Sequence, residues 1–379
     1  MKRTKVAFVT TSLIVGGQEK VLVDVANGMN RKEFEVALVL TKEPGALAKD
    51  LAEDVTVISG LRDGFLGSFL ALPRMMGWMK QWQPDCVFTF GSGDKFLLGR
   101  LAAKWAKATV ILSGLHTTPG PEHVGRSILG KWNKHLMGLN SGVVTVTSGL
   151  KEYLHEVEGY PLEKTYVIPN GTNTERFAPR PPSPDLQAEL KLPRGAPVVS
   201  LVAALRKEKR HDLYLKATAL VLKQCPQARF LVVGGGPSLK DLKYLANELG
   251  IAEAVHFLGP RHDIPELLNL STVAVLSSTD VESAPICMLE ALASGVPQVA
   301  PAIGGIPDIV ADGETGFLYT AGNVEALAGH MLTLFQDSQL HERMASASRL
   351  RAVEKFSVER MVLGHEAIIR KFLPEDPNE

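Results

Sequence analysis

Residues 198–233 read VVSLVAALRKEKRHDLYLKATALVLKQCPQARFLVV, and this stretch decides the fold class. It begins with the apolar run Val198–Val202, continues through helix-forming sequence at His211–Gln224, and ends with a second apolar run, Phe230–Val233. Short, continuously apolar strands are typical of a sheet buried on both faces, and a helix between two of them is typical of a parallel βαβ unit. The stretch therefore predicts an α/β domain with a parallel sheet.

The same alternation of short strands and helices runs through the rest of the chain. Because such alternation builds doubly wound parallel sheets, we expect two consecutive Rossmann-like domains that face a cleft. Ligands of open α/β folds bind outside the carboxyl ends of the strands, which places the expected site in that cleft. Further strands are predicted at Val6–Thr10, Val36–Leu40, Val55–Ile58, Cys86–Phe90, Thr109–Leu112, Val143–Thr147, Val255–Leu258, Val273–Leu276, Gln298–Ala300 and Gly316–Tyr319, and further helices at Glu19–Met29, Gly99–Ala106, Ser238–Leu249 and Ile286–Ala293.

Prolines mark the predicted boundary between the two domains. Six of them fall within Phe177–Pro197. Proline at this density opposes a helix or a central strand, so we expect the interdomain connection at 181–197. The domains are then 1–180 and 198–357, and 358–379 is predicted to form a C-terminal helix that packs back towards the N-terminal domain.

The composition excludes several classes of protein. Of the 379 residues 45% are hydrophobic, and 41 basic residues balance 41 acidic ones, so neither a disordered chain nor a protein built mainly to coat nucleic acid is expected. Three cysteines exclude a disulfide scaffold and suit a reducing compartment. The basic start before Val6–Val15 mimics a signal peptide, but no small-residue cleavage site follows. We favour a first buried strand that runs into a glycine turn, in a cytoplasmic protein.

A pair of carboxylates follows the predicted strand Val273–Leu276. Glu282 and Glu290 stand eight positions apart, and Glu290 lies on the apolar helix Ile286–Ala293. Backbone N–H groups at the start of that helix can hold a phosphate or a sugar hydroxyl. The spacing alone leaves a second interpretation open, an acidic helix start favoured by the helix dipole. Asp280 and Glu282 do not make a metal site, because a hard cation needs more oxygen ligands nearby, and we expect no metal.

The residues around this pair resemble a known family. Glu282-x7-Glu290, continued to Ala300, is similar to the E-x7-E signature of the retaining glycosyltransferases of family 4, the glycosyl transferases group 1. Further blocks match the same family in order and spacing: Val232–Pro237, Val255–Gly259, Gly304–Val310 and Asp312–Leu318. The N-terminal half matches more loosely, through Gly16-Gly17-x-Glu19, His116 and Val167–Thr172.

The resemblance implies a fold, a reaction and a donor site. It implies the GT-B fold, with a nucleotide-diphosphate sugar bound mainly by the C-terminal domain and the acceptor mainly by the N-terminal one. It implies transfer with retention of configuration, without a metal or a cofactor. Glu282 would contact hydroxyls of the donor sugar, and Glu290 would bind the ribose. The other implied donor contacts are Ser283, Ala284, Pro285, Ile286, Gly235 and Arg261, although Pro285 has no N–H to offer.

The loop after Val198–Val202 is expected to supply positive charge for the diphosphate. Lys209 stands at the lysine position of the family, whereas Ala204 stands where the family usually has an arginine. Arg206 is then expected to provide the guanidinium. The leaving nucleotide gains negative charge as the glycosidic bond breaks, so cations there assist the reaction. A solvated basic turn is the alternative interpretation.

Two features of the N-terminal half complete the predicted site. Gly16 and Gly17 follow the first strand and open a helix with Glu19, which suits contact with the donor diphosphate or the acceptor. A tight strand–helix turn explains the same residues. His116 follows the strand Thr109–Leu112, and the resemblance places a histidine there near the transferred sugar; we count it with Glu282 and Lys209 as catalytic.

The N-terminal half is also locally basic, with 10 basic and 4 acidic side chains in 62–135. Phe65–Trp82 and Arg126–His135 combine aromatic and apolar residues with cations, a composition that suits an anionic membrane surface. Helices that face a core and carry solvated cations explain it too, and we favour this second interpretation.

These patterns predict a hexosyltransferase that moves a sugar from a UDP- or GDP-hexose to a glycan or lipid-linked acceptor. Its expected role is the synthesis of a cell-surface glycan, exopolysaccharide or lipopolysaccharide, in the cytoplasm or at the inner face of the cell membrane. One alternative is a nucleotide-sugar epimerase or a phosphorylase on the same fold, which needs no carbohydrate acceptor. Another is a binding subunit that has the fold without turnover.

Overall fold

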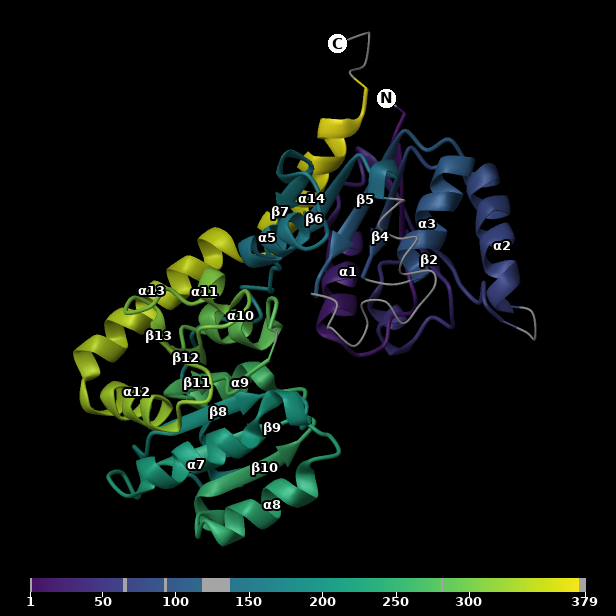
Figure 1. The fold of residues 1–379 in the computed structure, drawn as a ribbon. Helices are drawn as coiled ribbons and strands as arrows, with labels where there is room; N and C mark the ends of the chain where they lie inside the picture. The colour runs from purple at the N-terminus through teal and green to yellow at the C-terminus, as the bar shows by residue number, and fades with distance from the viewer. Residues whose placement is uncertain (1, 64–66, 92–93, 118–136, 281, 375–379) are drawn as a thin grey trace. The chain divides into compact units, whose positions relative to one another are not determined.

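A computed structural model describes residues 2–63, 67–91, 94–117, 137–280 and 282–374. The chain divides into two compact units (Figure 1). Unit 1 comprises Met1–Asn170 together with Val358–Glu379, and unit 2 comprises Gly171–Ser357. Each unit is an α/β domain with a parallel sheet, which confirms the predicted fold class.

Unit 1 is built on a parallel sheet in the order β3-β2-β1-β4-β5-β6-β7. The order runs outward from β1 in both directions, as in Rossmann-like sheets. The strands are β1 (Thr4–Thr10), β2 (Phe34–Leu40), β3 (Thr56–Ile58), β4 (Cys86–Phe90), β5 (Val110–Leu115), β6 (Gly142–Thr145) and β7 (Thr165–Val167), and the α-helices are α1 (Gly17–Gly28), α2 (Gly67–Trp82), α3 (Asp94–Trp105), α5 (Ser148–Glu156) and α14 (Val358–Phe372).

Helix α2 packs one face on the sheet. Ala71, Met75 and Met79 are fully buried in a core that they share with Val9 of β1 and Val87 of β4. The apolar run at 65–82 therefore serves mostly as core, in agreement with the interpretation favoured from the sequence. The second aromatic stretch, 126–135, lies outside the described residues.

Helix α14 completes unit 1 from the far end of the chain. It packs against α1, and in Figure 1 the yellow helix runs beside β6 and β7. Glu366 is buried and accepts hydrogen bonds from the backbone N–H of Asn30 (2.6 Å) and from Arg370 (2.9 Å). His365 packs its ring on Phe88 and Phe90 of β4, with centroids 5.6 and 5.9 Å away. The last helix is thus an integral part of the N-terminal core.

Burial of His365 makes the stability of unit 1 depend on pH. Burial lowers the pKa of this imidazole to about 4, below its ordinary value of 6.5. Between these values the unfolded chain binds a proton that the folded chain does not, so stability is lost as the pH falls from 6.5 towards 4, by about 1.4 kcal/mol per pH unit. In His365→Phe the transition temperature measured by calorimetry should fall less between about pH 7 and pH 5.5 than in the wild type. Equal decreases in both proteins would contradict this prediction.

Unit 2 has a parallel sheet in the order β10-β9-β8-β11-β12-β13. Its core packs α7, α8 and α12 on one face of the sheet and α9 and α10 on the other, and α13 contributes side chains to both. The strands are β8 (Val198–Val202), β9 (Arg229–Val233), β10 (Val255–Gly259), β11 (Val273–Val275), β12 (Gln298–Pro301) and β13 (Gly316–Tyr319), and the α-helices are α6 (Pro184–Glu189), α7 (His211–Leu222), α8 (Leu239–Glu248), α9 (Ile264–Leu270), α10 (Ile286–Ala293), α11 (Ile306–Ile309), α12 (Val324–Gln336) and α13 (Ser338–Lys355).

The proline-rich segment 181–197 belongs to unit 2, which corrects the predicted domain boundary. Ser183 caps α6, whose first residue is Pro184, a position where the missing N–H costs nothing. Leu186, Leu190 and Leu192 are buried against the sheet and α9. The unit boundary therefore lies at 170/171, ahead of the prolines and not within them.

No helix of the described chain is both long enough and apolar enough to span a bilayer.

Candidate active site

Two loops meet where the connections of the unit 2 sheet change direction. From β8 the chain proceeds outward through β9 and β10, and it then returns to the other side of β8 to form β11. In open α/β sheets, ligands bind outside the carboxyl ends of the strands at such a reversal. The loop 203–210 after β8 and the loop after β11 are therefore expected to build the site, and both carry predicted site residues.

An ion pair joins these two loops. Lys209 Nζ lies 2.5 Å from Glu282 Oε1. Glu282 is only 6% exposed, while the Lys209 side chain is 26% exposed. Two of the three residues predicted to be catalytic thus lie in contact, although they are far apart in the sequence.

Two serines without a distinctive sequence pattern hold this pair. Ser278 Oγ donates to Glu282 Oε1 at 2.6 Å, and Ser277 Oγ donates to the backbone carbonyl of Lys209 at 2.9 Å. Both serines are buried directly after β11. Their only sequence signal is their place at the carboxyl end of a predicted strand, beside the reversal of the sheet.

The backbone of Glu282 rests on two glycines. Gly305 N–H donates to the Glu282 carbonyl at 2.8 Å. A Cβ atom at Gly304 would lie 1.9 Å from the same carbonyl oxygen, and Gly304 has a φ of +53°. Only glycine fits this approach, because any side chain would collide with Glu282 and strain the left-handed backbone. The Gly304-Gly305 block is therefore part of the support of Glu282.

Helix α10 begins just after Glu282. Pro285 directly precedes the first turn, and among the described residues no side chain caps this helix start. Ala284 and Ile286 pack on the core beneath α10, and Ser283 precedes them in the loop. Met288 N–H donates to the Pro285 carbonyl at 3.1 Å, and the start of a helix such as α10 is a position at which backbone N–H groups can bind a polar ligand.

Glu290 lies on α10, the helix that follows the loop of Glu282. Burial raises the pKa of the Cys287 thiol to about 12, with the charges of Glu282 and Glu290 raising it and that of Lys209 lowering it. The thiol is therefore protonated at neutral pH. Burial and the Lys209 charge also lower the pKa of His211 to about 4, so this imidazole is neutral beside the cation.

The rest of the basic loop is shaped by the glycines after β9. Leu205 N–H donates to the Gly235 carbonyl at 2.9 Å, and a Cβ atom at Gly234 would lie 2.1 Å from the Ala203 carbonyl oxygen. This close approach explains why glycine stands at position 234. Of this glycine run, Gly235 alone was predicted to contact the donor. Arg206 is exposed, and its guanidinium lies 4.0 Å from the Glu208 carboxylate. The structure does not bring it into contact with Glu282.

Arg261 is bound by two carboxylates, neither of which is Glu282. Its guanidinium donates to both oxygens of Asp263, at 2.8 and 2.5 Å, and to Glu189 at 2.9 Å. These bonds fix the side chain at the start of α9 and compensate its charge. A diphosphate would have to compete with two carboxylates for this guanidinium.

The predicted residues of unit 1 lie at carboxyl ends of its strands. Gly16 precedes α1, Gly17 is the first residue of that helix, and the Glu19 carboxylate folds back to Gly16. His116 follows β5 directly, is buried, and packs its ring on Phe90 with centroids 4.9 Å apart.

The described residues contain no group of three or more His, Cys, Asp or Glu side chains arranged to hold a metal ion.

Removal of the Ser278 hydroxyl should weaken the site without unfolding it. In Ser278→Ala the Oε1 atom of Glu282 keeps Lys209 but loses a buried hydrogen bond to a charged group, a loss of about 1.5–3 kcal/mol where it is fully expressed. We expect kcat to fall about tenfold with nucleotide affinity unchanged, measured by steady-state kinetics and nucleotide titration. Ser271→Ala, which removes a hydroxyl bonded to the Leu267 carbonyl of α9, is the control. An unchanged kcat in Ser278→Ala would contradict the positioning role.

Comparison with known families accounts for both units. Residues 183–351 match the glycosyl transferases group 1, and residues 15–176 match glycosyltransferase family 4. The two matches correspond to unit 2 and unit 1, and the first contains the ion pair and both glutamates of the E-x7-E pattern.

Individual relatives are glycosyltransferases. The chain is 31% identical over 273 residues to a GDP-mannose-dependent α-(1-6)-phosphatidylinositol monomannoside mannosyltransferase of Mycolicibacterium smegmatis, with 69% of each chain covered. It is 26% identical over 377 residues to the UDP-Gal:α-D-GlcNAc-diphosphoundecaprenol α-1,3-galactosyltransferase of Escherichia coli, with 95% of each covered. It is also 32% identical to the N-acetyl-α-D-glucosaminyl L-malate synthase of Bacillus anthracis, but this match spans only half of that protein.

Solved structures share the fold over nearly the whole chain. HepE of Anabaena, solved in complex with UDP and glucose, has a TM-score of 0.82 and 25% identity, with 97% of this chain and 100% of HepE covered. WaaG, a glycosyltransferase of lipopolysaccharide biosynthesis, has a TM-score of 0.73 and 16% identity, with 96% and 99% covered. Fold, site and matches agree: the chain belongs to the glycosyl transferases group 1 of glycosyltransferase family 4, has the GT-B fold and is a hexosyltransferase.

Proposed function

We propose that this enzyme transfers a hexose from a UDP- or GDP-hexose to a glycan or lipid-linked acceptor, with retention of configuration and without a metal. The observation that carries the proposal is the Lys209–Glu282–Ser278 cluster at the sheet reversal of unit 2. The proposed role is the assembly of a cell-surface glycan.

Lys209 is the cation proposed to face the donor diphosphate. Its ammonium group has three N–H donors, and the pair with Glu282 uses one of them. The others are available to phosphate oxygens, whose negative charge grows as the bond to the sugar breaks. Arg206, which is exposed on the same loop, is proposed to swing onto the diphosphate in place of the family arginine at Ala204.

Glu282 is proposed to anchor a sugar hydroxyl and not to attack the sugar. Its Oε1 accepts from both Lys209 and Ser278, and these bonds stabilise the carboxylate and lower its nucleophilicity. Oε2 remains to accept from a hydroxyl. In the proposed step the bond from the anomeric carbon to the diphosphate breaks as the bond to the acceptor oxygen forms on the same face. The acceptor proton passes to the departing phosphate oxygen, so no protein nucleophile is needed.

The named relatives and the shared fold support the donor and acceptor classes. Two relatives use GDP-mannose and UDP-galactose, and their acceptors are a phosphatidylinositol mannoside and a lipid diphosphate sugar. HepE was solved with UDP and glucose. Glu290 is proposed to bind the ribose in this chain. For unit 1 the proposal rests on the family resemblance. Contact with the donor diphosphate or the acceptor is proposed for Gly16, Gly17 and Glu19, and a position near the transferred sugar for His116.

A nucleotide-sugar panel tests the donor site. We expect one UDP- or GDP-hexose to raise the unfolding temperature selectively, because a ligand that binds only the folded state stabilises it. Glu290→Ala should abolish this protection, while the control Glu342→Ala, an exposed carboxylate on α13, should keep it. Protection that persists in Glu290→Ala would contradict the ribose assignment.

Turnover distinguishes the proposal from its alternatives. A transferase releases nucleotide in proportion to acceptor, whereas an epimerase or a phosphorylase consumes the donor without a carbohydrate acceptor, and a binding subunit releases none. Retention is read from the anomeric coupling of the product, and metal independence from unchanged rates in a chelator. An inverted product or chelator-sensitive turnover would refute the corresponding part of the proposal.

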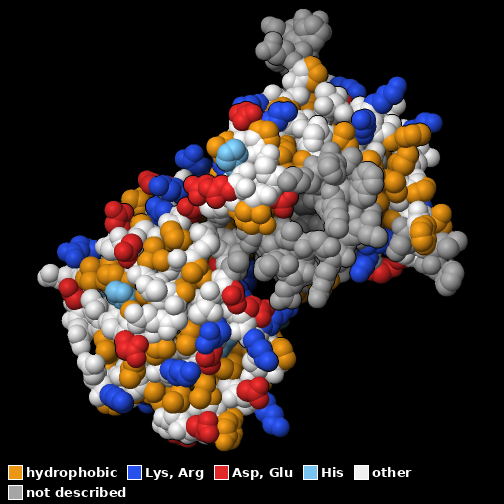
Figure 2. Space-filling view, viewed as in Figure 1, with side chains coloured by type: hydrophobic (Ala, Val, Ile, Leu, Met, Phe, Trp, Pro, Cys, Tyr) orange, Lys and Arg blue, Asp and Glu red, His pale blue; other side chains and the backbone are white. Residues whose placement is uncertain are grey.

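Exposed apolar side chains on unit 1 support a peripheral contact with an anionic membrane. Phe69 and Leu70, near the start of α2, are 82% and 40% exposed. Figure 2 shows hydrophobic side chains along the surface over α2. Partition of such groups into the interface favours binding. Phe69→Ser should reduce co-sedimentation with vesicles that contain anionic phospholipid; no binding by the wild type would refute the contact.

A further inference from the structure

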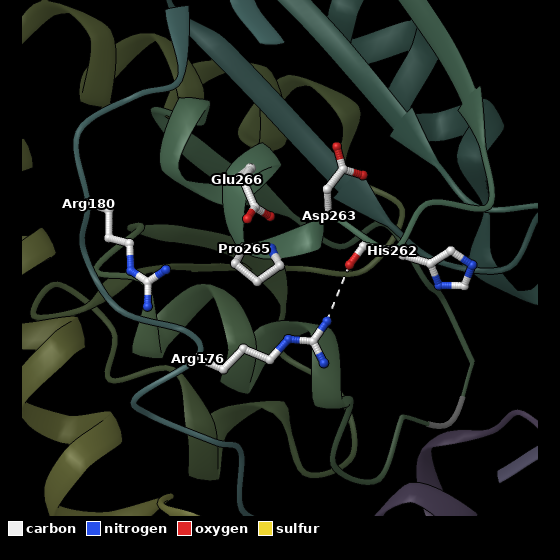
Figure 3. Close-up of a pocket in the computed structure, with 6 residues that line it drawn as sticks. All are labelled: Arg176, Arg180, His262, Asp263, Pro265 and Glu266. Carbon is white, nitrogen blue, oxygen red and sulfur yellow. Dashed lines mark hydrogen bonds between the residues drawn. The ribbon is translucent and has the colours of Figure 1, made fainter. Parts of the chain in front are cut away.

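Unit 2 contains a polar pocket that shares no residue with the Lys209–Glu282 cluster. It has a volume of about 380 Å³, within the range of small-molecule sites. The segment that leads from β7 to α6 forms one wall and the start of α9 forms the other (Figure 3). The residues that line it are Arg176, Arg180, His262, Asp263, Pro265 and Glu266.

The backbone that carries the two arginines is fixed on both sides. Asn269 of α9 accepts from Arg180 N–H at 2.8 Å and donates to the Ala178 carbonyl at 3.2 Å. From α13, Arg349 donates to the carbonyls of Thr174 and Phe177, at 2.8 and 2.9 Å. The Phe177 ring lies in the core, and the Arg176 guanidinium lies over it, 5.3 Å from the ring centroid. The pocket is therefore held in place by rigid elements, which lowers the cost of ordering it around a ligand.

The two guanidinium groups retain most of their donors. Arg176 donates to the His262 carbonyl at 3.2 Å, and Arg180 donates to the Glu175 carbonyl at 3.1 Å. Within the described parts of the chain, neither has a carboxylate within 4.0 Å. Each guanidinium has five N–H groups in a fixed fork, the geometry that binds a phosphate through two bonds.

The carboxylates of the pocket are not equivalent. Asp263 binds Arg261 through both oxygens, and in Figure 3 its side chain points away from the arginines. In Figure 3 the Glu266 carboxylate lies next to the Pro265 ring. Two exposed cations, one exposed carboxylate and one proline ring thus line the pocket.

We propose that this pocket binds a sugar phosphate. The phosphate would lie between Arg176 and Arg180, Glu266 would accept from a sugar hydroxyl, and the Pro265 ring would contact the apolar face of the sugar. The Glu266 carboxylate disfavours binding of a polyanion, because it would repel a second negative charge on the ligand. A neutral sugar would leave both cations without a partner. A monoester of phosphate on a hexose satisfies all three groups.

Isothermal titration of the full-length protein with α-D-glucose 1-phosphate, inorganic phosphate and glucose tests this assignment. We expect glucose 1-phosphate to bind most tightly, phosphate at least tenfold more weakly, and glucose not measurably. Arg180→Gln and Glu266→Gln should each lower the affinity for glucose 1-phosphate at least tenfold. The control Arg194→Gln, an exposed arginine of the same unit, should leave its affinity unchanged.

A nucleotide arm separates this pocket from the donor site. UDP and GDP binding should be unaffected by Arg180→Gln, and glucose 1-phosphate should still bind to Glu290→Ala and in the presence of saturating nucleotide. Displacement of glucose 1-phosphate by nucleotide would assign it to the donor site and overturn the proposal. No binding of glucose 1-phosphate, or equal binding by Arg180→Gln, would overturn it as well, whatever the donor experiments show.

Discussion

Glu282→Gln is expected to lower kcat about 10²–10³-fold, the scale of losing one preorganised charged group that acts on the transition state. Glutamine keeps the shape of the side chain and can still accept from Lys209 and Ser278. It removes the negative charge that is proposed to hold the donor hydroxyl and that pairs with the ammonium group of Lys209. Lys209 is partly exposed, so water can solvate it when its partner becomes neutral. The free energy of unfolding should therefore change by only about 1 kcal/mol.

The control is Glu342→Gln, which makes the same chemical change on an exposed face of α13. Its kcat should match the wild type within about twofold. The measurement is nucleotide release under saturating donor and acceptor, with unfolding followed in parallel. If Glu282→Gln turned over at the wild-type rate, the ion pair would be structural and the proposed site would be wrong.

Gly304→Ala should have the second largest effect, through a residue with no functional group. A methyl group there would lie 1.9 Å from the carbonyl oxygen of Glu282, so the backbone of one of the two must move. Displacement of a positioning group by about 1 Å can cost about 10²-fold in rate. We expect kcat to fall by at least this factor, whereas the nucleotide, for which Glu290 on α10 is the proposed ribose ligand, should bind almost as before.

Gly313→Ala provides a matched control. Gly313 also has a positive φ, +76°, but a Cβ atom there would have no neighbour within 4 Å. Both variants thus carry left-handed strain of about 1–2 kcal/mol, and only Gly304→Ala also displaces Glu282. Equal kinetics in the two variants would show that strain, and not the position of Glu282, explains the loss.

The regular elements around the site could be predicted because their local signals agree with the tertiary structure. The strand Val198–Val202 and the helix Ile286–Ala293 have the predicted bounds. The family resemblance indicated Lys209 and Glu282 individually, and the parallel order of β8 and β11 explains why they meet. Lys209 and Glu282 meet because β8 and β11 are adjacent parallel strands whose following loops lie at the same edge of the sheet. The sequence indicates this neighbourhood only through the alternation of strands and helices.

What escaped prediction lacks a distinctive local pattern. Ser277 and Ser278 resemble any serines after a strand, and their roles depend on where Lys209 and Glu282 lie in space. Arg261 stood at a donor position by resemblance, yet Asp263 and Glu189 bind it. The prolines of 181–197 led to the prediction of a connection without a helix. The segment contains a short helix that begins after Ser183 with Pro184, and Leu186 and Leu190 are buried in the core.

The return of α14 to unit 1 has a consequence for the order of synthesis. A ribosome makes Met1–Asn170 first, but the helix that buries His365 and Glu366 against this segment emerges only after all of unit 2. Unit 2 can therefore fold while unit 1 still lacks α14, so that the surface of β4 and α1 that this helix covers remains exposed. Such exposed apolar surface is what chaperones recognise and what aggregates. A nascent chain of this enzyme should thus mature its later domain first and close its earlier domain last.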